Sequence, residues 1–414
     1  MDEQPSSGLT NKDIVGLKYF EQLLPLLKRL RDVGCERDKA ANRELHFDQY
    51  CFLVLLYLFN PICSSLRAVQ QASELDKVQK RLGVKRAALG SLSEAASVFD
   101  PEPLREIIAE LNERAGPLKS DPRLNVVPQV VTAFDGTLVS ALPRMAAASL
   151  LKQQTGSGLV KWRLHTHFEV LRSIPWRIDV TPDGGGDADE RAVLAGTLQA
   201  DRCYVMDRGL AKFSLFNAIH AKSSSYVCRL RDNSSYEVLE ERPLSEADHA
   251  AHVLSDQMVR LGQGSKAADR PDHAMRLVIV KIKPHVSKGK YKGGSSGVDS
   301  DGLLRLATNL IDVPAEIIAL LYHHRWAIEI FFRTFKHLLG CRHLLSHNVN
   351  GITIQTYCAI IACLLLSLWT GRKPTKRTFE MLCYFLMGWA SAEDVERHLA
   401  KLKLADEIAA QKKS

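Results

Sequence analysis

The sequence from Tyr322 to Lys336 reads YHHRWAIEIFFRTFK and combines an apolar face with a polar stripe. At about 100° per residue on an α-helix, four side chains project from one narrow stripe: Tyr322, Arg325, Glu329 and Lys336. Apolar residues such as Ile328 and Phe335 occupy a separate arc, as on a helix that packs one face against a core. Pro314 suits the first turn and Gly340 the position after the end. The pattern predicts one helix of about 25 residues.

The polar stripe has two interpretations. It is either a solvated face, on which Arg325 and Glu329 form an i,i+4 ion pair worth a few tenths of a kcal/mol, or a site that presents an acid between cations. The spacing Tyr-x2-Arg-x3-Glu-x6-Lys resembles the signature of a large family of bacterial insertion-sequence transposases of the DDE type. Four fixed residues at this spacing arise by chance in roughly one chain of this length in several hundred.

Two acids upstream support the second interpretation. The run from Val130 to Val139 is typical of a buried strand and carries Asp135, and a shorter strand-like run from Cys203 ends at Asp207. An ionised acid in an apolar run must be paired or bound to metal. The alternative is that Asp-Gly and Asp-Arg-Gly only end these strands in turns.

The resemblance implies that Asp135, Asp207 and Glu329 are the DDE triad of an RNase H-like core. In this family the first acid lies on the first strand, the second at the end of the fourth, and the glutamate on a later helix. Hard carboxylate oxygens suit Mg²⁺, and two ions about 4 Å apart activate the attacking oxygen and stabilise the leaving 3′ oxygen at phosphorus. The expected cofactor is therefore two Mg²⁺ ions, for which Mn²⁺ is expected to substitute.

The remaining residues of the stripe are expected to bind DNA. Arg325 and Lys336 would hold phosphates near the cleaved end, the first through its bidentate fork and the second as a point charge. Tyr322 would orient a phosphate or a base.

Composition agrees with a DNA-binding protein without proving one. The chain has 414 residues, a formal net charge of +8 and nine cysteines with no C-x-x-C pair. The modest positive charge favours a polyanion but also fits many proteins that bind none. With no signal peptide at the start and no disulfide pattern, we expect a protein of the reducing cytoplasm, and the family resemblance implies that it is bacterial and nucleoid-associated. The apolar run from Tyr357 to Trp369 is too short for a membrane span and predicts a buried helix, so no membrane partner is expected.

The first 120 residues lack strand alternation and are predicted to be helical. Two short helices around Gly83 with a basic cluster predict a helix-turn-helix that binds transposon ends. The DNA-binding candidates in this cluster are Lys80, Arg81, Lys85 and Arg86. A helical bundle with a solvated charged face is the other interpretation, and the family resemblance favours DNA.

The predicted fold is α/β (α+β), an RNase H-like core with a β-rich insertion between helical N- and C-terminal regions. After the Asp135 strand we expect strands at 160–171 and 176–180, a helix at 190–198, and then the Asp207 strand. Strands are also expected at 226–230, 236–240, 275–282 and 303–309. The predicted regions are 1–120 (DNA-end binding), 121–225 (core), 226–310 (last core strand and insertion), 311–345 (glutamate helix) and 346–414 (helical).

Two other segments invite a binding role. The acids Asp183, Asp187 and Asp189 lack the spacing of an EF-hand loop and predict a turn and a helix start. The basic loop at 288–297 either contacts DNA phosphate or is only a hairpin tip, and it lacks the lysine-after-glycine spacing of a P-loop. No nucleotide cofactor is therefore expected.

Two positions depart from the family pattern. Leu210 follows Asp-Arg-Gly where the family commonly has an aromatic residue, and the insertion contains no tryptophan to hold a flipped base. Whether a DNA hairpin intermediate forms is left open.

The sequence thus predicts a transposase that catalyses metal-dependent strand cleavage and strand transfer at the ends of an insertion sequence, as a homodimer on double-stranded DNA. Two alternatives stay open: a regulator that binds DNA without cutting it, and a metal-dependent nuclease without strand transfer. The intact acids argue against the regulator.

Overall fold

The computed structural model describes residues 24–39, 43–60, 63–82, 84–115, 121–140, 161–262, 270–282, 302–340, 344–346, 348–372, 375–386 and 388–411. The chain forms two compact units. The first contains residues 1–118, 138–162 and 332–414, and the second contains 119–137 and 163–331. The N- and C-terminal segments, which the sequence assigns to separate regions, therefore belong to one unit.

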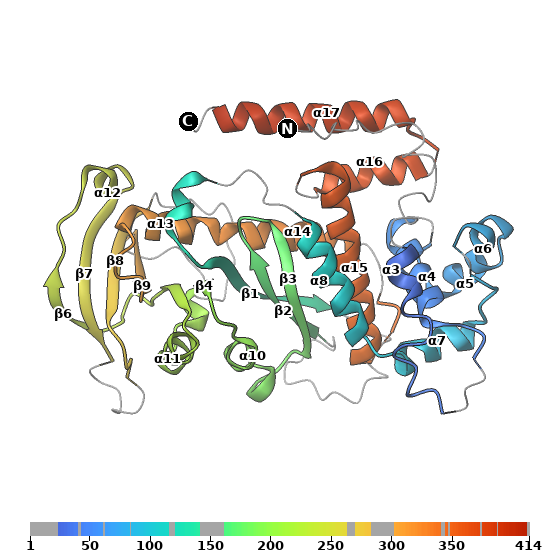
Figure 1. Ribbon diagram of the computed structural model, residues 1–414, viewed down its shortest axis with the longest axis horizontal. Helices are drawn as coiled ribbons and strands as arrows, with labels where there is room; N and C mark the ends of the chain where they lie inside the picture. The colour runs from blue at the N-terminus through green and yellow to red at the C-terminus, as the bar shows by residue number, and fades with distance from the viewer. Residues whose placement is uncertain are drawn as a thin grey trace, which may run out of the picture. The chain divides into compact units, whose positions relative to one another are not determined.

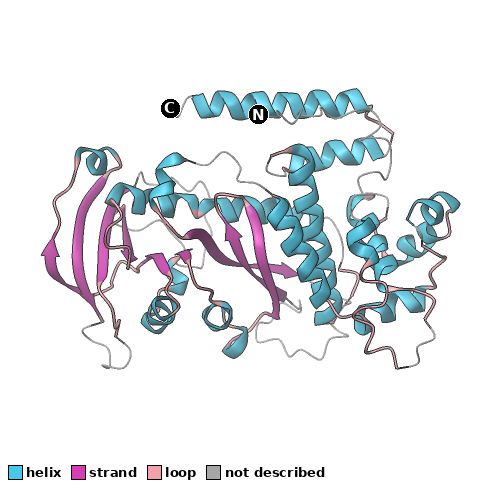
Figure 2. Ribbon diagram, in the orientation of Figure 1, coloured by secondary structure: helices cyan, strands magenta, loops and turns pink. Residues whose placement is uncertain are grey.

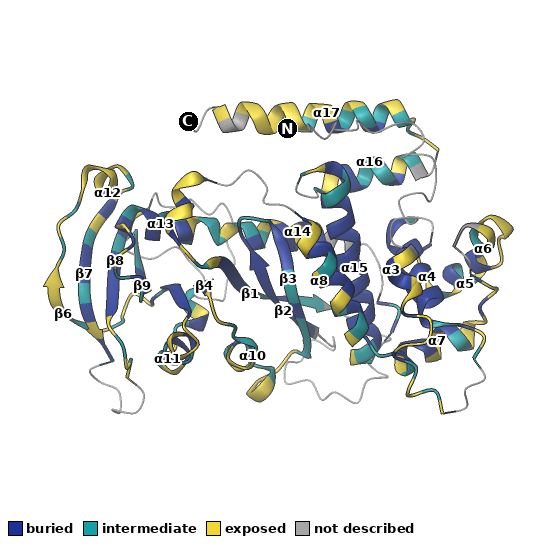
Figure 3. Ribbon diagram, in the orientation of Figure 1, coloured by how far each residue is buried: buried dark blue, intermediate teal, exposed yellow. Residues whose placement is uncertain are grey.

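Helices dominate the first unit (Figure 1). Those of its N-terminal part are α3 (Leu24–Lys28), α4 (Phe47–Phe59), α5 (Leu66–Ser73), α6 (Asp76–Leu82), α7 (Leu89–Val98) and α8 (Glu102–Arg114). Those of its C-terminal part are α15 (Val349–Thr370), α16 (Lys376–Leu386) and α17 (Ala392–Gln411). Helix α15 packs against α4, α7 and α8, and Figure 3 shows it buried along its length. It is apolar on every side, as a central helix must be.

The ends of α15 are set by local chemistry. The Asn348 side chain accepts a hydrogen bond from the Gly351 N–H at the start, and Gly371 adopts a left-handed conformation with φ of 64° after the end. By length and composition the helix is apolar enough to cross a membrane, but 94% of its apolar window is buried by the protein. This burial is the behaviour of a core helix, as the sequence predicts.

A nine-stranded sheet runs through the second unit in the order β3-β2-β1-β4-β5-β9-β8-β7-β6 (Figure 2). Its strands are β1 (Val130–Ser140), β2 (Lys161–Glu169), β3 (Ile174–Pro182), β4 (Arg202–Met206), β5 (Ser225–Arg229), β6 (Tyr236–Glu241), β7 (Val253–Leu261), β8 (Met275–Lys281) and β9 (Leu303–Thr308). Strands β1, β4 and β5 are parallel neighbours. The mixed sheet with its helices confirms the predicted α/β class, and the first five strands in this order are consistent with the predicted RNase H-like core.

The register of β1 and β4 decides where the two aspartates lie. Phe134 pairs with Met206 in this parallel ladder. Asp135 and Asp207 each follow one residue later, so both lie just beyond the same end of this ladder, Asp135 near the middle of β1 and Asp207 directly after β4. Beneath them, helices α10 (Glu190–Thr197) and α11 (Phe213–Ala221) contribute Leu194 and Phe216 to the buried core of the sheet. Figure 1 shows α10 and α11 on one side of β4 and α13 (Ala315–His324) on the other.

The predicted single helix over 314–340 is wrong in one respect. The structure contains α13 (Ala315–His324) and α14 (Trp326–Gly340), which are separated at Arg325. The Arg325 N–H bonds to the Tyr322 carbonyl oxygen at 3.0 Å and the Ile328 N–H bonds to the Arg325 carbonyl oxygen at 3.2 Å. These i to i+3 bonds tighten the chain at the junction.

The sequence also missed strand β7. Its middle carries Asp256 and Gln257, which interrupt the apolar alternation that identifies a strand. The Arg276 guanidinium on β8 donates two 2.6 Å hydrogen bonds to the buried Asp256 carboxylate. Another Arg276 nitrogen donates to the Leu310 carbonyl oxygen at 3.0 Å, in the segment that leads to α13. The β-rich insertion is thereby attached to the segment that precedes that helix.

Replacing Arg276 by methionine is expected to lower the free energy of unfolding by about 3–5 kcal/mol, because it leaves the Asp256 carboxylate buried without its partner. The control is Arg260→Met on β7, whose ion pair with Glu237 is exposed and contributes about 1 kcal/mol or less. Urea unfolding of both variants measures the difference. Equal, small losses would show that the buried pair does not hold the insertion together.

The stability of the second unit is expected to depend on His167. This histidine on β2 is buried, donates to or accepts from the Thr197 hydroxyl at 2.9 Å, and has its pKa lowered by burial to about 3. In the unfolded chain its pKa is about 6.5, so the unfolded state binds a proton first and stability falls as pH drops below about 6.5. His167→Gln is expected to flatten the fall in melting temperature between about pH 7 and pH 4, whereas the exposed His249→Gln is not. Parallel curves for His167→Gln and wild type would contradict this.

Candidate active site

Asp135 is a half-buried acid near the middle of β1, next to a glycine. The Gly136 N–H donates to its Oδ1 at 2.8 Å. Burial raises the pKa of Asp135 to about 7, Arg325 opposes this rise, and Glu329 adds to it. A carboxylate in this position needs a nearby cation to be ionised at neutral pH.

Arg325 supplies that positive charge to two acids at once. One of its terminal nitrogens lies 3.3 Å from Asp135 Oδ2, and both contact Glu329 Oε1 at 3.3 Å. The Arg325 side chain is only 11% exposed. Burial lowers its pKa, but Tyr322 and the three acids outweigh burial and the net shift is upward. The i,i+4 pair between Arg325 and Glu329 is present, but it is not on a fully solvated face, because the Arg325 side chain is largely buried and also contacts Asp135 of a neighbouring strand.

Tyr322 makes the corresponding contact to the third acid. Its hydroxyl donates to Asp207 Oδ1 at 3.1 Å, directly after β4. The Arg325 guanidinium lies 5.9 Å from the centre of the Tyr322 ring. Burial and the Asp207 charge both raise the pKa of the Tyr322 hydroxyl, so it remains a donor. Five of the residues predicted from sequence thus meet beside the end of the β1–β4 ladder.

The donor set suits a hard divalent cation, since Asp135 and Glu329 already share one positive group. Within the described ranges, however, no three histidine, cysteine or acidic side chains are grouped closely enough to hold a metal. The side chains of Arg325 and Tyr322 instead make the contacts to the three carboxylates.

Glu190 is a fourth acid at this place, which the sequence identifies only as a helix start. It is the first residue of α10 and forms an ion pair with Arg163 of β2. Arg163 also contacts Asp183 at 2.9 Å. A methyl group at Gly136 would lie only 2.9 Å from Cδ of Glu190, so the glutamate packs directly on the backbone beside Asp135. The one sequence feature related to this contact is the glycine that follows Asp135. A glycine leaves room for a neighbour but does not indicate which residue will fill it.

Lys336 is exposed on α14 and belongs to the first unit. Its proposed contact with DNA phosphate stays a prediction. The basic loop at 288–297 lies outside the described residues.

The basic cluster near the N-terminus flanks Gly83, which lies outside the described residues. Arg81 belongs to α6, and the side chains of Lys80 and Lys85 are exposed. Arg86 is also exposed and lies 3.0 Å from Glu74, which compensates part of its charge. Binding of this cluster to DNA stays a prediction.

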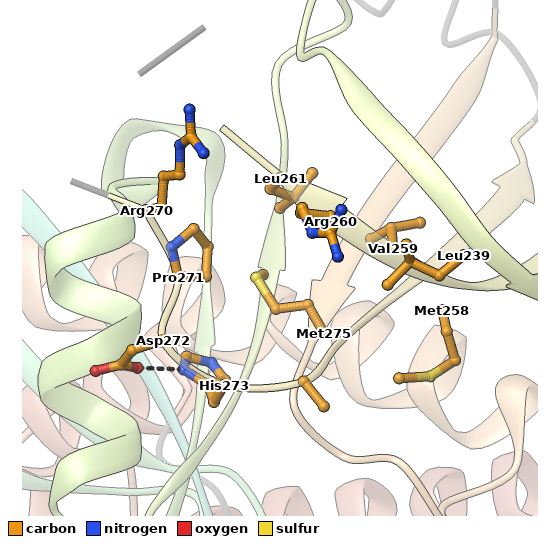
Figure 4. A pocket seen from close by; sticks show the side chains of 11 residues that line it. Leu239, Met258, Val259, Arg260, Leu261, Arg270, Pro271, Asp272, His273 and Met275 are labelled. Atoms are coloured by element: carbon orange, nitrogen blue, oxygen red, sulfur yellow. Dashed lines mark hydrogen bonds and ion pairs between the residues drawn. The ribbon is translucent and has the colours of Figure 1, made fainter. Parts of the chain in front are cut away.

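A hollow of about 430 Å³ lies in the β-rich insertion (Figure 4). It is lined by residues of β6, β7 and the segment that enters β8, and none of the predicted acids reaches it. His273 at its edge, whose side chain is only 3% exposed, contacts Asp272 and the Tyr226 hydroxyl, both at 2.9 Å, and stacks on His220. Both ring nitrogens thus have partners, and the hollow gives no sign of the site's chemistry.

Comparison with known proteins identifies the family. The transposase DDE domain family matches residues 128–365. A candidate transposase of Sinorhizobium fredii is 28% identical over 205 residues, 49% of this chain and 52% of that protein. A probable transposase of an insertion sequence element of Geobacillus stearothermophilus is 28% identical over 180 residues, 43% of this chain and 42% of that protein. The chain spans about half the length of these curated relatives.

Among solved structures, the piggyBac transposase in a synaptic complex with hairpin DNA aligns with a TM-score of 0.35 and 11% identity, over 97% of this chain and 87% of that one. The family match is the finding that assigns the chain. It covers more than half of the sequence and includes Asp135, Asp207 and Glu329. The chain therefore belongs to the transposase DDE domain family.

Proposed function

We propose that this protein is a DNA transposase that cleaves and transfers strands at the ends of an insertion sequence. The observation that carries the proposal is the convergence of Asp135, Asp207 and Glu329, from three separate elements, on the side chains of Arg325 and Tyr322. A fold needs no such half-buried cluster of acids for stability, because ionised groups are costly to remove from water. Clusters of this kind are typical of functional sites.

In the proposed enzyme, Asp135, Asp207 and Glu329 would hold two Mg²⁺ ions, with Mn²⁺ as a substitute. Bound metal would supply Lewis acid activation of an oxygen nucleophile and stabilisation of the leaving oxygen at phosphorus. Carboxylates suit this task because they are hard ligands and leave positions for water and phosphate.

Arg325 and Tyr322 would position the DNA. The guanidinium fork already spans two carboxylate groups, so it has the geometry to grip two oxygens of a phosphate. The Tyr322 hydroxyl, which remains protonated, would donate to a phosphate oxygen or a base. Lys336 would add charge to the same contact.

The proposed partner is double-stranded DNA, comprising the element's ends and a target, and the proposed assembly is a homodimer on DNA. Lys80, Arg81, Lys85 and Arg86 would bind phosphates of the ends. We expect the protein to act in the bacterial cytoplasm, without a nucleotide cofactor.

Asp135→Asn, Asp207→Asn and Glu329→Gln are each expected to abolish metal-dependent cleavage while preserving end binding. Loss of a group that supports a metal ligand lowers activity roughly 10- to 100-fold, so loss of a ligand is expected to exceed that. The assay uses DNA carrying the repeats that flank the gene and scores both cleaved and joined products. The exposed Asp187→Asn is the control. A triad variant that cuts at the wild-type rate would exclude that residue, and cleavage without joining would favour the nuclease.

Arg325→Lys is expected to lower the cleavage rate at least about 10-fold, because lysine keeps the charge but cannot span two groups. Arg231→Lys, at an exposed position of the same unit, is the matched control. Single-turnover cleavage and melting temperature are measured on both. Normal cleavage by Arg325→Lys would show that the planar fork is not used.

A further inference from the structure

The first turn of α10 contacts both chain segments that carry the aspartates. Its first residue, Glu190, packs on Gly136 beside Asp135. Its second residue, Arg191, donates from Nε to the Gly209 carbonyl oxygen at 2.9 Å, two residues after Asp207. One short turn is therefore in contact with the β1 segment and with the segment after β4.

Glu190 is held in place from the opposite side. Arg163 of β2 pairs with the Glu190 carboxylate and also with Asp183 at 2.9 Å, so its guanidinium bridges the two acids. The Arg163 side chain is only 26% exposed. Glu190 is thus wedged between a fixed cation and the Gly136 backbone.

The turn itself is anchored. Asp189 caps α10 by accepting a hydrogen bond from the Arg191 N–H at 2.9 Å. One turn later, Leu194 is fully buried in the core of the sheet. An element fixed in this way can transmit a defined position to whatever it touches.

We propose that Glu190 and Arg191 are positioning residues that set the separation of Asp135 and Asp207, Glu190 through the backbone of Gly136 and Arg191 through the carbonyl of Gly209. The inference rests on the proposed function. The distance between Asp135 and Asp207 matters only if the two acids bind the same metal ions. Glu190 itself is not a ligand in this scheme.

The proposal gives Gly136 a specific role. A methyl group there would overlap Oε1 of Glu190 and lie 2.9 Å from its Cδ, so the end of the Glu190 side chain would have to shift. Because the backbone of Gly136 is not left-handed, alanine would cause little strain of its own. Gly136→Ala should therefore act by displacing the Glu190 side chain.

The test is a double-mutant cycle with Gly136→Ala, Glu190→Ala and the combined variant. Mn²⁺ affinity is measured by titration calorimetry, the cleavage rate as a function of Mn²⁺ concentration, and the melting temperature by calorimetry. Each single change is expected to weaken Mn²⁺ affinity about 10- to 100-fold, the range for groups that orient metal ligands. The combined variant is expected to bind Mn²⁺ at least as tightly as the single variant with the lower affinity, because both changes remove the same contact.

Conservative variants separate positioning from folding. Glu190→Gln keeps the shape and one acceptor for Arg163, so it is expected to recover most of the Mn²⁺ affinity lost in Glu190→Ala. Glu246→Gln is the matched control, since Glu246 also begins a helix after a capping residue and is exposed. If Glu190→Ala does not fold, Arg191→Ala, which removes the Gly209 bond, tests the second contact.

The proposal would be overturned if the losses of Mn²⁺ affinity in Gly136→Ala and Glu190→Ala multiplied in the combined variant. It would also be overturned if Glu190→Ala bound Mn²⁺ with wild-type affinity. These outcomes differ from failure of the proposed function. In that case the wild-type protein and Asp135→Asn would give the same Mn²⁺ titration and neither would cut.

Discussion

The contact on which the site depends is the Arg325 guanidinium, buried between Asp135 of β1 and Glu329 of α14. Asp135 is half-buried beside the Glu329 carboxylate, and burial together with the Glu329 charge raises the pKa of Asp135. A shared cation offsets both effects. The helix junction at Arg325 directs that cation into the site, and the adjacent turn brings Tyr322 to Asp207.

The β-rich insertion has a structural role that follows from the same requirement. Besides the bond from Arg276, the Arg242 side chain donates to the Ile311 carbonyl oxygen at 2.6 Å, and Asp248 accepts from the Glu316 N–H at 2.8 Å. These contacts hold the segment before α13 and its first turn. The strands added after the core therefore position the helix that carries Tyr322 and leads to Arg325.

The sequence was sufficient to predict an element and its functional residue where an apolar run of strand-like residues also contains or ends at an acid. The apolar runs around Asp135 and Asp207 predicted β1 and β4, and a parallel ladder then required their ends to be adjacent. The junction at Arg325 was missed because assigning side chains to helix faces at 100° per residue assumes a continuous helix. The position of Arg325 is set instead by its long-range contact with Asp135. Strand β7 was missed because its central residue is the acid Asp256. The arginine that neutralises this buried carboxylate lies on another strand and cannot be identified from local sequence. Glu190 was missed because it packs against the backbone of Gly136, and a contact with a residue that has no side chain leaves no pattern in the sequence.

The measurement that tests the central claim most directly is the anomalous scattering of Mn²⁺ in crystals of the protein bound to a DNA end. The account predicts density for the metal in contact with Asp135, Asp207 and Glu329, with the Arg325 guanidinium moved from these carboxylates to a DNA phosphate. Metal bound elsewhere, or Arg325 still held between Asp135 and Glu329 in a complex that cleaves DNA, would contradict it.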